Sequence, residues 1–168
     1  VLEHPYYGPD YTNEEVEHEL KRFKLNNFKR CNDIAKETAA LIADNKTVGW
    51  FQGRMEFGPR ALGGRSILGN PKNKDMKDIV NKSIKGREPW RPFAPSFLAE
   101  DYADYVKQPY NSPFMIIAFQ AIEEKVSEIA SAAHVDNTVR VQSVRKEVAP
   151  RYWELINEFK KITGVPAL

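Results

Sequence analysis

The chain has 168 residues, 42% of them apolar, which is enough to bury one hydrophobic core and suits one domain or a piece of a larger protein. Its formal net charge of +2 argues neither for a nucleic-acid coat nor for an acidic tail. The single cysteine, Cys31, excludes an internal disulfide and a cysteine-built zinc site, which favours a reducing, cytoplasmic setting, and no apolar run is long enough to span a bilayer.

The N-terminal third is expected to form two helices followed by a strand. Thr12 and Glu15 have the spacing of a capping box, which predicts a short helix from about Asn13 to Arg22. A second helix is expected near Asn32 to Asp44, where apolar residues recur at helical spacing. Val48 to Phe51 then has the composition of a buried strand, and it leads directly into a segment rich in glycine and arginine.

The rest of the chain is expected to alternate helices and strands. A helix is predicted from Asp75 to Ile84, and a closing helix from about Pro150 to Thr163 is terminated by Gly164. Between these helices the sequence predicts three strands, at residues 94–98, 114–119 and 139–144. In the last strand Arg140 and Gln142 alternate with valines, the period of two expected when one face of a strand is solvated. This interleaving predicts an α/β or α+β fold with an open sheet.

The glycine- and arginine-rich segment, residues 53–71, holds three arginines, five glycines and two prolines. Glycines let backbone N–H groups approach an anion closely, and arginines grip phosphate or carboxylate oxygens with two parallel donors. The segment lacks the Lys-Ser/Thr pair of a Walker A loop and the spacing of a dinucleotide-binding fingerprint. It therefore predicts an anion-binding loop of another kind, and the alternative is a tight surface turn with solvated arginines.

A second basic run strengthens the prediction of an anion site. From Arg54 to Arg91 the chain holds ten basic and four acidic residues, a net charge of +6. Lys82 and Lys85 come from the end of a predicted helix, whereas Arg87 and Arg91 belong to a proline-rich, extended stretch. These two directions allow convergence on a compact anion such as a nucleotide, whereas a nucleic-acid site would spread basic and aromatic residues over a wide face.

Four ordered motifs carry a specific resemblance: GWFQGRMEFGPRALGGRSILGNP, KGREPWRPFAPS, HVDNTVRVQSV and LINEFKKITGVPAL. Together they resemble the C-terminal domain of the NodU/CmcH-type O-carbamoyltransferases. The resemblance implies a YrdC-like α/β (α+β) fold, a twisted open mixed sheet with flanking helices and a basic concave face. It also implies that residues 1–11 are a linker from a missing N-terminal domain and that residues 12–168 are the YrdC-like domain, truncated at its C-terminal end.

The resemblance further implies an enzyme module, a carbamoyltransferase that forms carbamoyl-adenylate from carbamoyl phosphate and ATP. The missing N-terminal domain of the same polypeptide would then transfer the carbamoyl group to a small-molecule hydroxyl. ATP is the expected cofactor, with Mg²⁺ arriving on its phosphates, and the isolated fragment is expected to be inactive or partly active. No membrane or nucleic-acid partner is expected, and a homo-oligomer is left open.

Site residues follow by matching the family's motifs. Arg60 and Arg65 are expected to bind phosphates and the carbamoyl moiety, and Lys85 and Arg91 to hold the ATP phosphates. These four would be the catalytic cations, because transfer at phosphorus requires alignment of two anions rather than a protein nucleophile. Arg140 would line the nucleotide pocket.

Other polar residues are weighed between a site role and a structural one. Ser96 is a candidate ligand-binding hydroxyl or a strand-end hydroxyl, and His134 belongs to a loop that would shape the nucleotide pocket. His134 and Asp136 have no third metal ligand at suitable spacing, so no metal site is predicted. Glu56 is interpreted as a partner that orients an arginine, with a general base as the alternative.

Two positions depart from the family's usual pattern. The family usually carries Asn where this chain has Gly64, and Gly where it has Asn137. Since both residue types tolerate left-handed backbone angles, both turns are expected to survive. Two alternative functions also stay open, an RNA-binding YrdC-like module and a non-catalytic docking domain.

Overall fold

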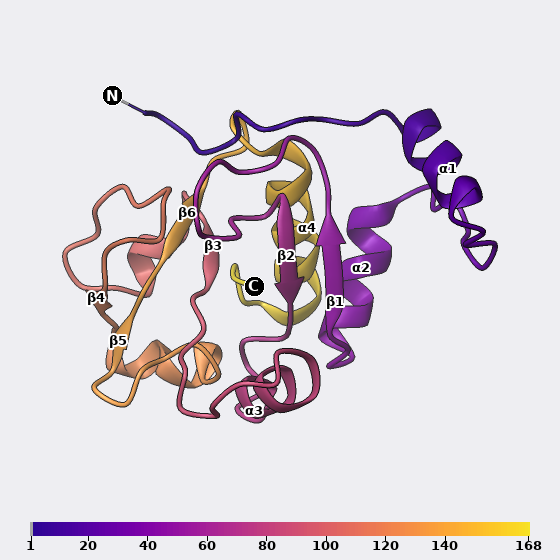
Figure 1. The fold of residues 1–168 in the computed structure, drawn as a ribbon. Helices are drawn as coiled ribbons and strands as arrows, with labels where there is room; N and C mark the ends of the chain where they lie inside the picture. The colour runs from indigo at the N-terminus through magenta and orange to yellow at the C-terminus, as the bar shows by residue number, and fades with distance from the viewer. Residues whose placement is uncertain (1) are drawn as a thin grey trace.

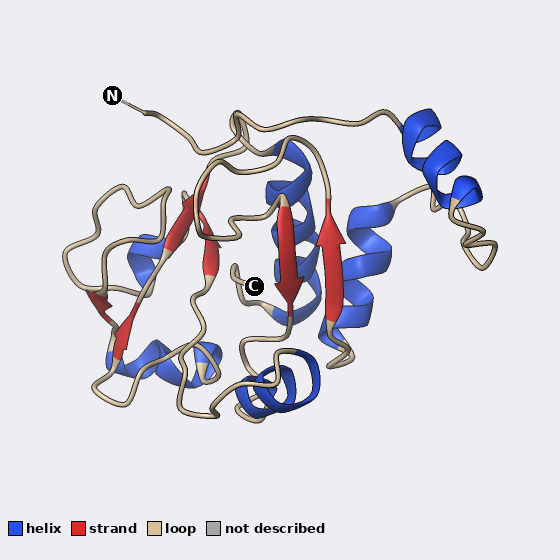
Figure 2. Cartoon of the chain, viewed as in Figure 1, coloured by secondary structure: helices blue, strands red, loops and turns tan. Residues whose placement is uncertain are grey.

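The computed structural model describes residues 2–168 as mixed helices and short strands, which confirms the predicted fold class (Figures 1 and 2). The α-helices are α1 (Asn13–Arg22), α2 (Ile34–Ala43), α3 (Met76–Ile79) and α4 (Pro150–Thr163). Helix α3 continues into a π-helix, η1 (Val80–Ile84), and two 3-10 segments are η2 (Tyr102–Asp104) and η3 (Glu123–Ile129). The strands are β1 (Val48–Phe51), β2 (Arg65–Leu68), β3 (Ser96–Leu98), β4 (Phe119–Gln120), β5 (Thr138–Val139) and β6 (Gln142–Val144).

Two helices have the bounds that their end signals predict. The capping box of α1 is formed, because the Glu15 amide donates to Thr12 Oγ1 at 3.2 Å and the Thr12 amide donates to Glu15 Oε2 at 2.8 Å. Helix α4 starts with Pro150 in its first turn and ends at Gly164, whose φ of +79° is the left-handed cap that glycine favours. Of residues 2–168, no helix combines the length and the apolar composition that a membrane crossing requires.

The strands pair in three two-stranded sheets of mixed direction. Strands β1 and β2 form an antiparallel hairpin, β3 and β6 are parallel, and β4 and β5 are antiparallel. The C-terminal segment lies along the other edge of β3, where the Leu168 amide donates to the Ser96 carbonyl at 3.0 Å and the Ser96 amide donates to the Leu168 carbonyl at 2.8 Å. Ser96 is therefore held from both sides in the interior of the molecule.

The structure corrects two of the predicted strands and adds one. Of residues 114–119 only Phe119 is in a strand, because Met115 turns inward with a left-handed φ of +55°. The 139–144 strand is broken into β5 and β6, and Gln142 is 2% exposed rather than solvated. Strand β2 was not predicted, since its pairing with β1 is a tertiary contact inside the glycine- and arginine-rich segment.

The core lies between helices and strands in the centre of the molecule. Helix α2 packs against α4, and both cover the β1–β2 hairpin, as Figure 2 shows. Phe97, Phe159 and Leu155 are fully buried there. Helix α1 stands apart at one side (Figure 1), and none of its residues is buried. The packed core thus fixes the hairpin and β3, the elements that carry the functional segments.

Candidate anion-binding site

The connection between β1 and β2, residues 52–64, is named here the Gly/Arg loop, and a buried carboxylate organises it. Glu56 is 4% exposed, and its Oε1 accepts the amide hydrogens of Leu62 at 2.6 Å and Gly64 at 2.7 Å. Its Oε2 accepts from Nε of Arg65 at 2.9 Å. Burial raises the pKa of Glu56, but these hydrogen bonds outweigh burial and hold the pKa below its ordinary value. The interpretation of Glu56 as an arginine-orienting partner is confirmed.

Two glycines allow this loop to pack closely. Gly63 has a φ of +104°, and a Cβ there would lie 2.1 Å from the ring of Tyr152 in α4. A Cβ at Gly64 would lie 2.9 Å from the Arg54 carbonyl oxygen. The expectation for Gly64 is thus corrected: its φ is not left-handed, and a side chain there would instead have to displace the Arg54 carbonyl oxygen by a few tenths of an ångström. Asn137, in contrast, has the expected left-handed φ of +58°.

Residues 85–93, named here the basic loop, follow the π-helix η1. Lys85 is the C-cap residue of η1, and its Nζ lies 5.6 Å from the ring centroid of Phe93. The guanidinium carbon of Arg87 lies 5.0 Å from the same centroid. Phe93 therefore supports both cations through cation–π contacts and gives the loop an aromatic base.

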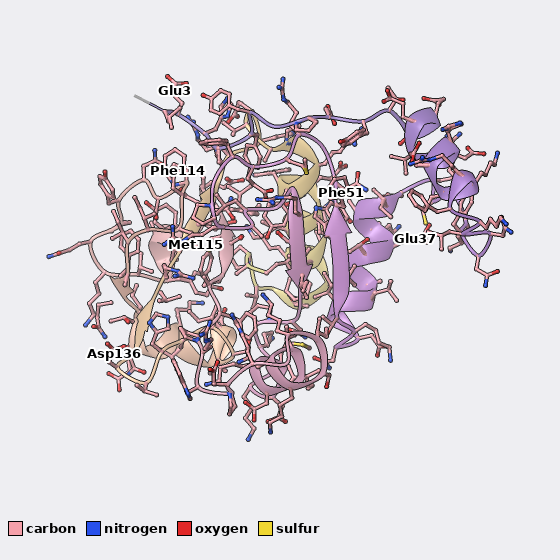
Figure 3. All side chains as sticks on the ribbon, in the orientation of Figure 1. Glu3, Glu37, Phe51, Phe114, Met115 and Asp136 are labelled. Atoms are coloured by element: carbon pink, nitrogen blue, oxygen red, sulfur yellow. The ribbon has the colours of Figure 1, made fainter. Side chains whose placement is uncertain are left out.

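A cavity of about 300 Å³ lies between the Gly/Arg loop, the basic loop and β3. Four cations line it and are named here the cavity cations: Arg60, Lys85, Arg87 and Arg140. The other wall is more apolar and includes Met115, which Figure 3 labels, and Leu168. The convergence that the sequence suggested for the two basic runs is therefore present, and it involves segments from four distant parts of the chain.

The cavity cations have no carboxylate partners. Within residues 2–168, no Asp or Glu forms an ion pair with any of the four. Nε of Arg140 is buried and has no hydrogen-bond partner among the described residues. Burial and the charge of Arg60 lower the pKa of Arg140, and burial and the charge of Arg87 lower the pKa of Lys85. An anion in the cavity would relieve both the repulsion and the unsatisfied donor.

Three of the predicted residues lie elsewhere. Arg65 is turned to Glu56, and Arg91 pairs with Glu88 at 2.9 Å on the surface. His134 Nδ1 lies 2.9 Å from the Thr138 hydroxyl in the turn before β5, and burial lowers its pKa. None of the three lines the cavity, so their roles in ligand binding stay predictions.

The turn before β5 is braced by its own polar groups. The Asp136 carboxylate accepts from the amide of Thr138 at 3.0 Å, and Figure 3 shows Asp136 at the outer end of the β4–β5 pair. Among residues 2–168, no group of three or more His, Cys, Asp and Glu side chains gathers as metal ligands would.

Ser96 lines the cavity, but its hydroxyl is already engaged. It donates to Oε1 of Gln142 at 2.7 Å, and Nε2 of Gln142 donates to the Leu62 carbonyl at 2.8 Å. Gln142 thus ties the Gly/Arg loop to the β3–β6 pair.

Sequence reasoning placed Arg87 in the basic run without a specific role, although the structure puts it in the cavity. Its signal was its position between two predicted site residues, Lys85 and Arg91.

The fold mixes helices and strands, and among the described residues a cluster of cations without carboxylate partners lines one cavity. A family model described as the carbamoyltransferase C-terminus matches residues 39–168. Nodulation protein NolNO of Sinorhizobium fredii is 44% identical over 172 residues, which cover 99% of this chain and 25% of that protein. The chain belongs to the carbamoyltransferase C-terminus family.

Further relatives share the same pattern of coverage. Nodulation protein NolO of Bradyrhizobium diazoefficiens is 43% identical over 168 residues, covering 97% of this chain and 31% of that protein. Nodulation protein U of Rhizobium tropici is 38% identical over 132 residues, covering 79% of this chain and 23% of that protein. The chain thus spans between 23% and 31% of the length of these three relatives.

Proposed function

We propose that the cation cavity binds ATP and carbamoyl phosphate and forms carbamoyl-adenylate, which the rest of a longer polypeptide uses to carbamoylate a small-molecule hydroxyl. The observation that supports this most is the set of four unpaired cations around one cavity, in a chain of the carbamoyltransferase C-terminus family. Two anionic reactants repel each other in water, and fixed cations compensate for that repulsion without reorganising.

The proposed reaction balances without a protein nucleophile. One water releases phosphate from carbamoyl phosphate and leaves carbamate. A carbamate oxygen then forms a bond to the α-phosphorus of ATP, and the bond from that phosphorus to the bridging oxygen breaks, so that pyrophosphate leaves. Arg60 and Arg140 would stabilise the negative charge that accumulates on the phosphate oxygens, and Lys85 would hold the outer phosphates.

The fit to Mg²⁺ follows from the chemistry of the lining. None of the described residues that line the cavity is an aspartate or a glutamate, and these are the oxygen ligands that Mg²⁺ prefers in proteins. A Mg²⁺ ion that enters with ATP would be coordinated by phosphates and water, and the chain's own part is to position those phosphates.

The geometry favours this proposal over an RNA-binding module. The cavity cations converge on one pocket, whereas RNA binding would need cations and aromatic side chains along an extended face. If the site binds a nucleotide, ATP should compete for it at low concentration. If it binds RNA, the affinity should weaken steeply as the salt concentration rises.

The test is pyrophosphate release from ATP with and without carbamoyl phosphate, measured on the 168-residue chain and on a version extended beyond Leu168. Release that depends on carbamoyl phosphate is expected, and Arg60→Ala should reduce it at least about tenfold, the size of one lost charged hydrogen bond. Arg22→Ala on α1 is the matched control, since the contacts of the Arg22 guanidinium among the described residues are local, an ion pair with Glu19 and a cation–π contact with Phe23. Folded protein that neither binds ATP nor releases pyrophosphate would contradict the proposal.

A further inference from the structure

A buried asparagine lies directly behind the basic loop. Asn81, in the π-helix η1, is 0% exposed, and it does not line the cavity. Its main-chain carbonyl oxygen accepts from the main-chain N–H of Arg87 at 3.0 Å. In its side chain, Oδ1 accepts from Nε of Arg87 at 2.6 Å. Its Nδ2 donates to the carbonyls of Pro89 at 3.3 Å and Arg91 at 3.1 Å. One side chain thus satisfies three separate points of the loop.

The prolines of the loop explain why it needs such a partner. Pro89 and Pro92 have no amide hydrogen, so the loop cannot hold its path through a regular backbone ladder. The carbonyls that face inward must find donors elsewhere, since a buried carbonyl without a partner is costly. The amide of Asn81 supplies those donors, and its position in a π-helix fits the frequent occurrence of such turns at functional sites.

The contact to Arg87 fixes a direction as well as a position. A guanidinium carries five N–H donors in a fixed plane, so a hydrogen bond at Nε holds that plane in place and leaves the donors of the two terminal nitrogens unused. Nε of Arg87 is bound to Asn81 from behind, the ring of Phe93 lies 5.0 Å from its guanidinium carbon, and Arg87 lines the cavity. The terminal donors of Arg87 are thereby left for a ligand.

The neutrality of Asn81 matters equally. No carboxylate among residues 2–168 pairs with Arg87, so its full positive charge stays in the cavity. An aspartate in place of Asn81 would be close in size, but it would place a negative charge at the guanidinium and weaken its attraction for an anion. An uncharged acceptor holds the arginine without neutralising it.

We infer that Asn81 is a positioning residue that aims Arg87 at the pyrophosphate portion of the bound nucleotide. This inference rests on the proposed function, because it assigns a partner to the same cavity. Arg87 is the residue that contacts the ligand, and Asn81 acts only through it. The chemical group recognised is a diphosphate, to which the two terminal nitrogens of Arg87 can donate in parallel.

The test is a double-mutant cycle with inorganic pyrophosphate as the probe, by calorimetry on the 168-residue chain. Arg87→Ala and Asn81→Ala are each expected to weaken binding by about 10- to 100-fold, the range for a hydrogen bond to a charged group. The double variant is expected to bind like Arg87→Ala alone, because Asn81 acts through Arg87. Independent, additive losses would overturn the inference, since a merely structural role gives additivity.

Asn70→Ala is the matched control. Asn70 is also buried, at 7% exposed, and it braces a loop through Asn45 Oδ1 and the Lys72 amide, yet it bonds none of the cavity cations. Its loss is expected to change pyrophosphate affinity by less than about threefold. An equal loss in Asn70→Ala and Asn81→Ala would count against a specific role for Asn81.

A second variant covers the case in which Asn81→Ala does not fold. Asn81→Asp keeps the size and the Oδ1 acceptor but removes the Nδ2 donor to Pro89 and Arg91. It is expected to lose at least about tenfold in pyrophosphate affinity through the added charge and the lost donor together. Wild-type affinity in folded Asn81→Asp overturns the inference while leaving the proposed function intact. Wild-type protein that binds neither pyrophosphate nor ATP overturns the proposed function itself, so the two failures are distinguishable.

Discussion

Two arginines, one directly after the Gly/Arg loop and one in the basic loop, are each held by a buried side chain, but the two partners differ in charge. Glu56 holds Arg65 with a carboxylate at 2.9 Å, and Asn81 holds Arg87 with a neutral amide oxygen at 2.6 Å. Arg65 is turned away from the cavity, and Arg87 lines it. A carboxylate converts its arginine into part of the scaffold, whereas an amide leaves the charge free to meet a ligand.

The largest effect is expected where the charged partner is removed. Glu56→Ala leaves the amides of Leu62 and Gly64 without an acceptor, so we expect the free energy of unfolding to fall by about 3–5 kcal/mol, as when a buried ion pair loses one member. Urea unfolding followed by the fluorescence of buried Trp50 measures this. The control Glu88→Ala removes only an exposed pair to Arg91 and should change stability by less than about 1 kcal/mol.

The Glu56 carboxylate also makes the stability of the protein depend on pH. The folded-state pKa of Glu56 lies below its ordinary value of 4.5, so the folded state binds this proton less tightly than the unfolded state does. The contribution to stability is therefore present above pH 4.5 and is lost as the pH falls through the lowered pKa. The difference in stability between the wild type and Glu56→Gln should narrow in that window, and a difference independent of pH would contradict the assignment.

An intermediate effect is expected from two arginines of one motif. Arg60→Ala should weaken pyrophosphate binding by about 10- to 100-fold and leave stability nearly unchanged, because Arg60 has no carboxylate partner to abandon. Arg65→Ala should instead lower stability, since it leaves Glu56 buried and unpaired. Calorimetry measures the pyrophosphate affinity of both variants, and urea unfolding measures their stability. Equal losses of affinity would erase the distinction between an arginine that binds ligand and one that belongs to the scaffold.

The smallest effect is expected from Lys85, whose side chain is exposed overall but partly desolvated by its neighbours. Burial and the neighbouring Arg87 hold its pKa below 10.5, so deprotonation begins earlier than for a free lysine. Pyrophosphate affinity should fall by about fivefold or less as the pH rises through this window, while the protein without ligand becomes slightly more stable. Lys85→Arg should keep its affinity across the same pH range, and a parallel decline in that variant would assign the effect to another group.

Local signals predicted the elements that carry them, and tertiary contacts decided the others. The bounds of α1 and α4 follow from Thr12 with Glu15 and from Pro150 with Gly164, all of which act within one helical turn. The apolar run at residues 114–119 gave no such signal. Its one strand residue, Phe119, is paired because β5 lies beside it, and Met115 leaves the strand geometry to reach the cavity.

The residues of the candidate site also fall into those that sequence motifs predicted and those that tertiary contacts decided. The motif resemblance selected Arg60, Lys85 and Arg140, Ser96 was weighed as a ligand-binding or a strand-end hydroxyl, and the structure brings all four to one cavity. It could not separate Arg60 from Arg65, because the choice depends on which of the two the buried Glu56 reaches. Gln142 was expected to be solvated from its alternation with valines, but its hydrogen bonds to Ser96 and Leu62 keep it inside.

The contact between Gly63 and the ring of Tyr152 couples two positions that lie far apart in the chain. The ring occupies the space that a Cβ at position 63 would need, with only 2.1 Å between them. A side chain at residue 63 would therefore meet two obstacles, the ring of Tyr152 and a φ of +104° that L side chains rarely adopt, so shrinking residue 152 alone would not make room for it, and we expect homologous chains to keep glycine there.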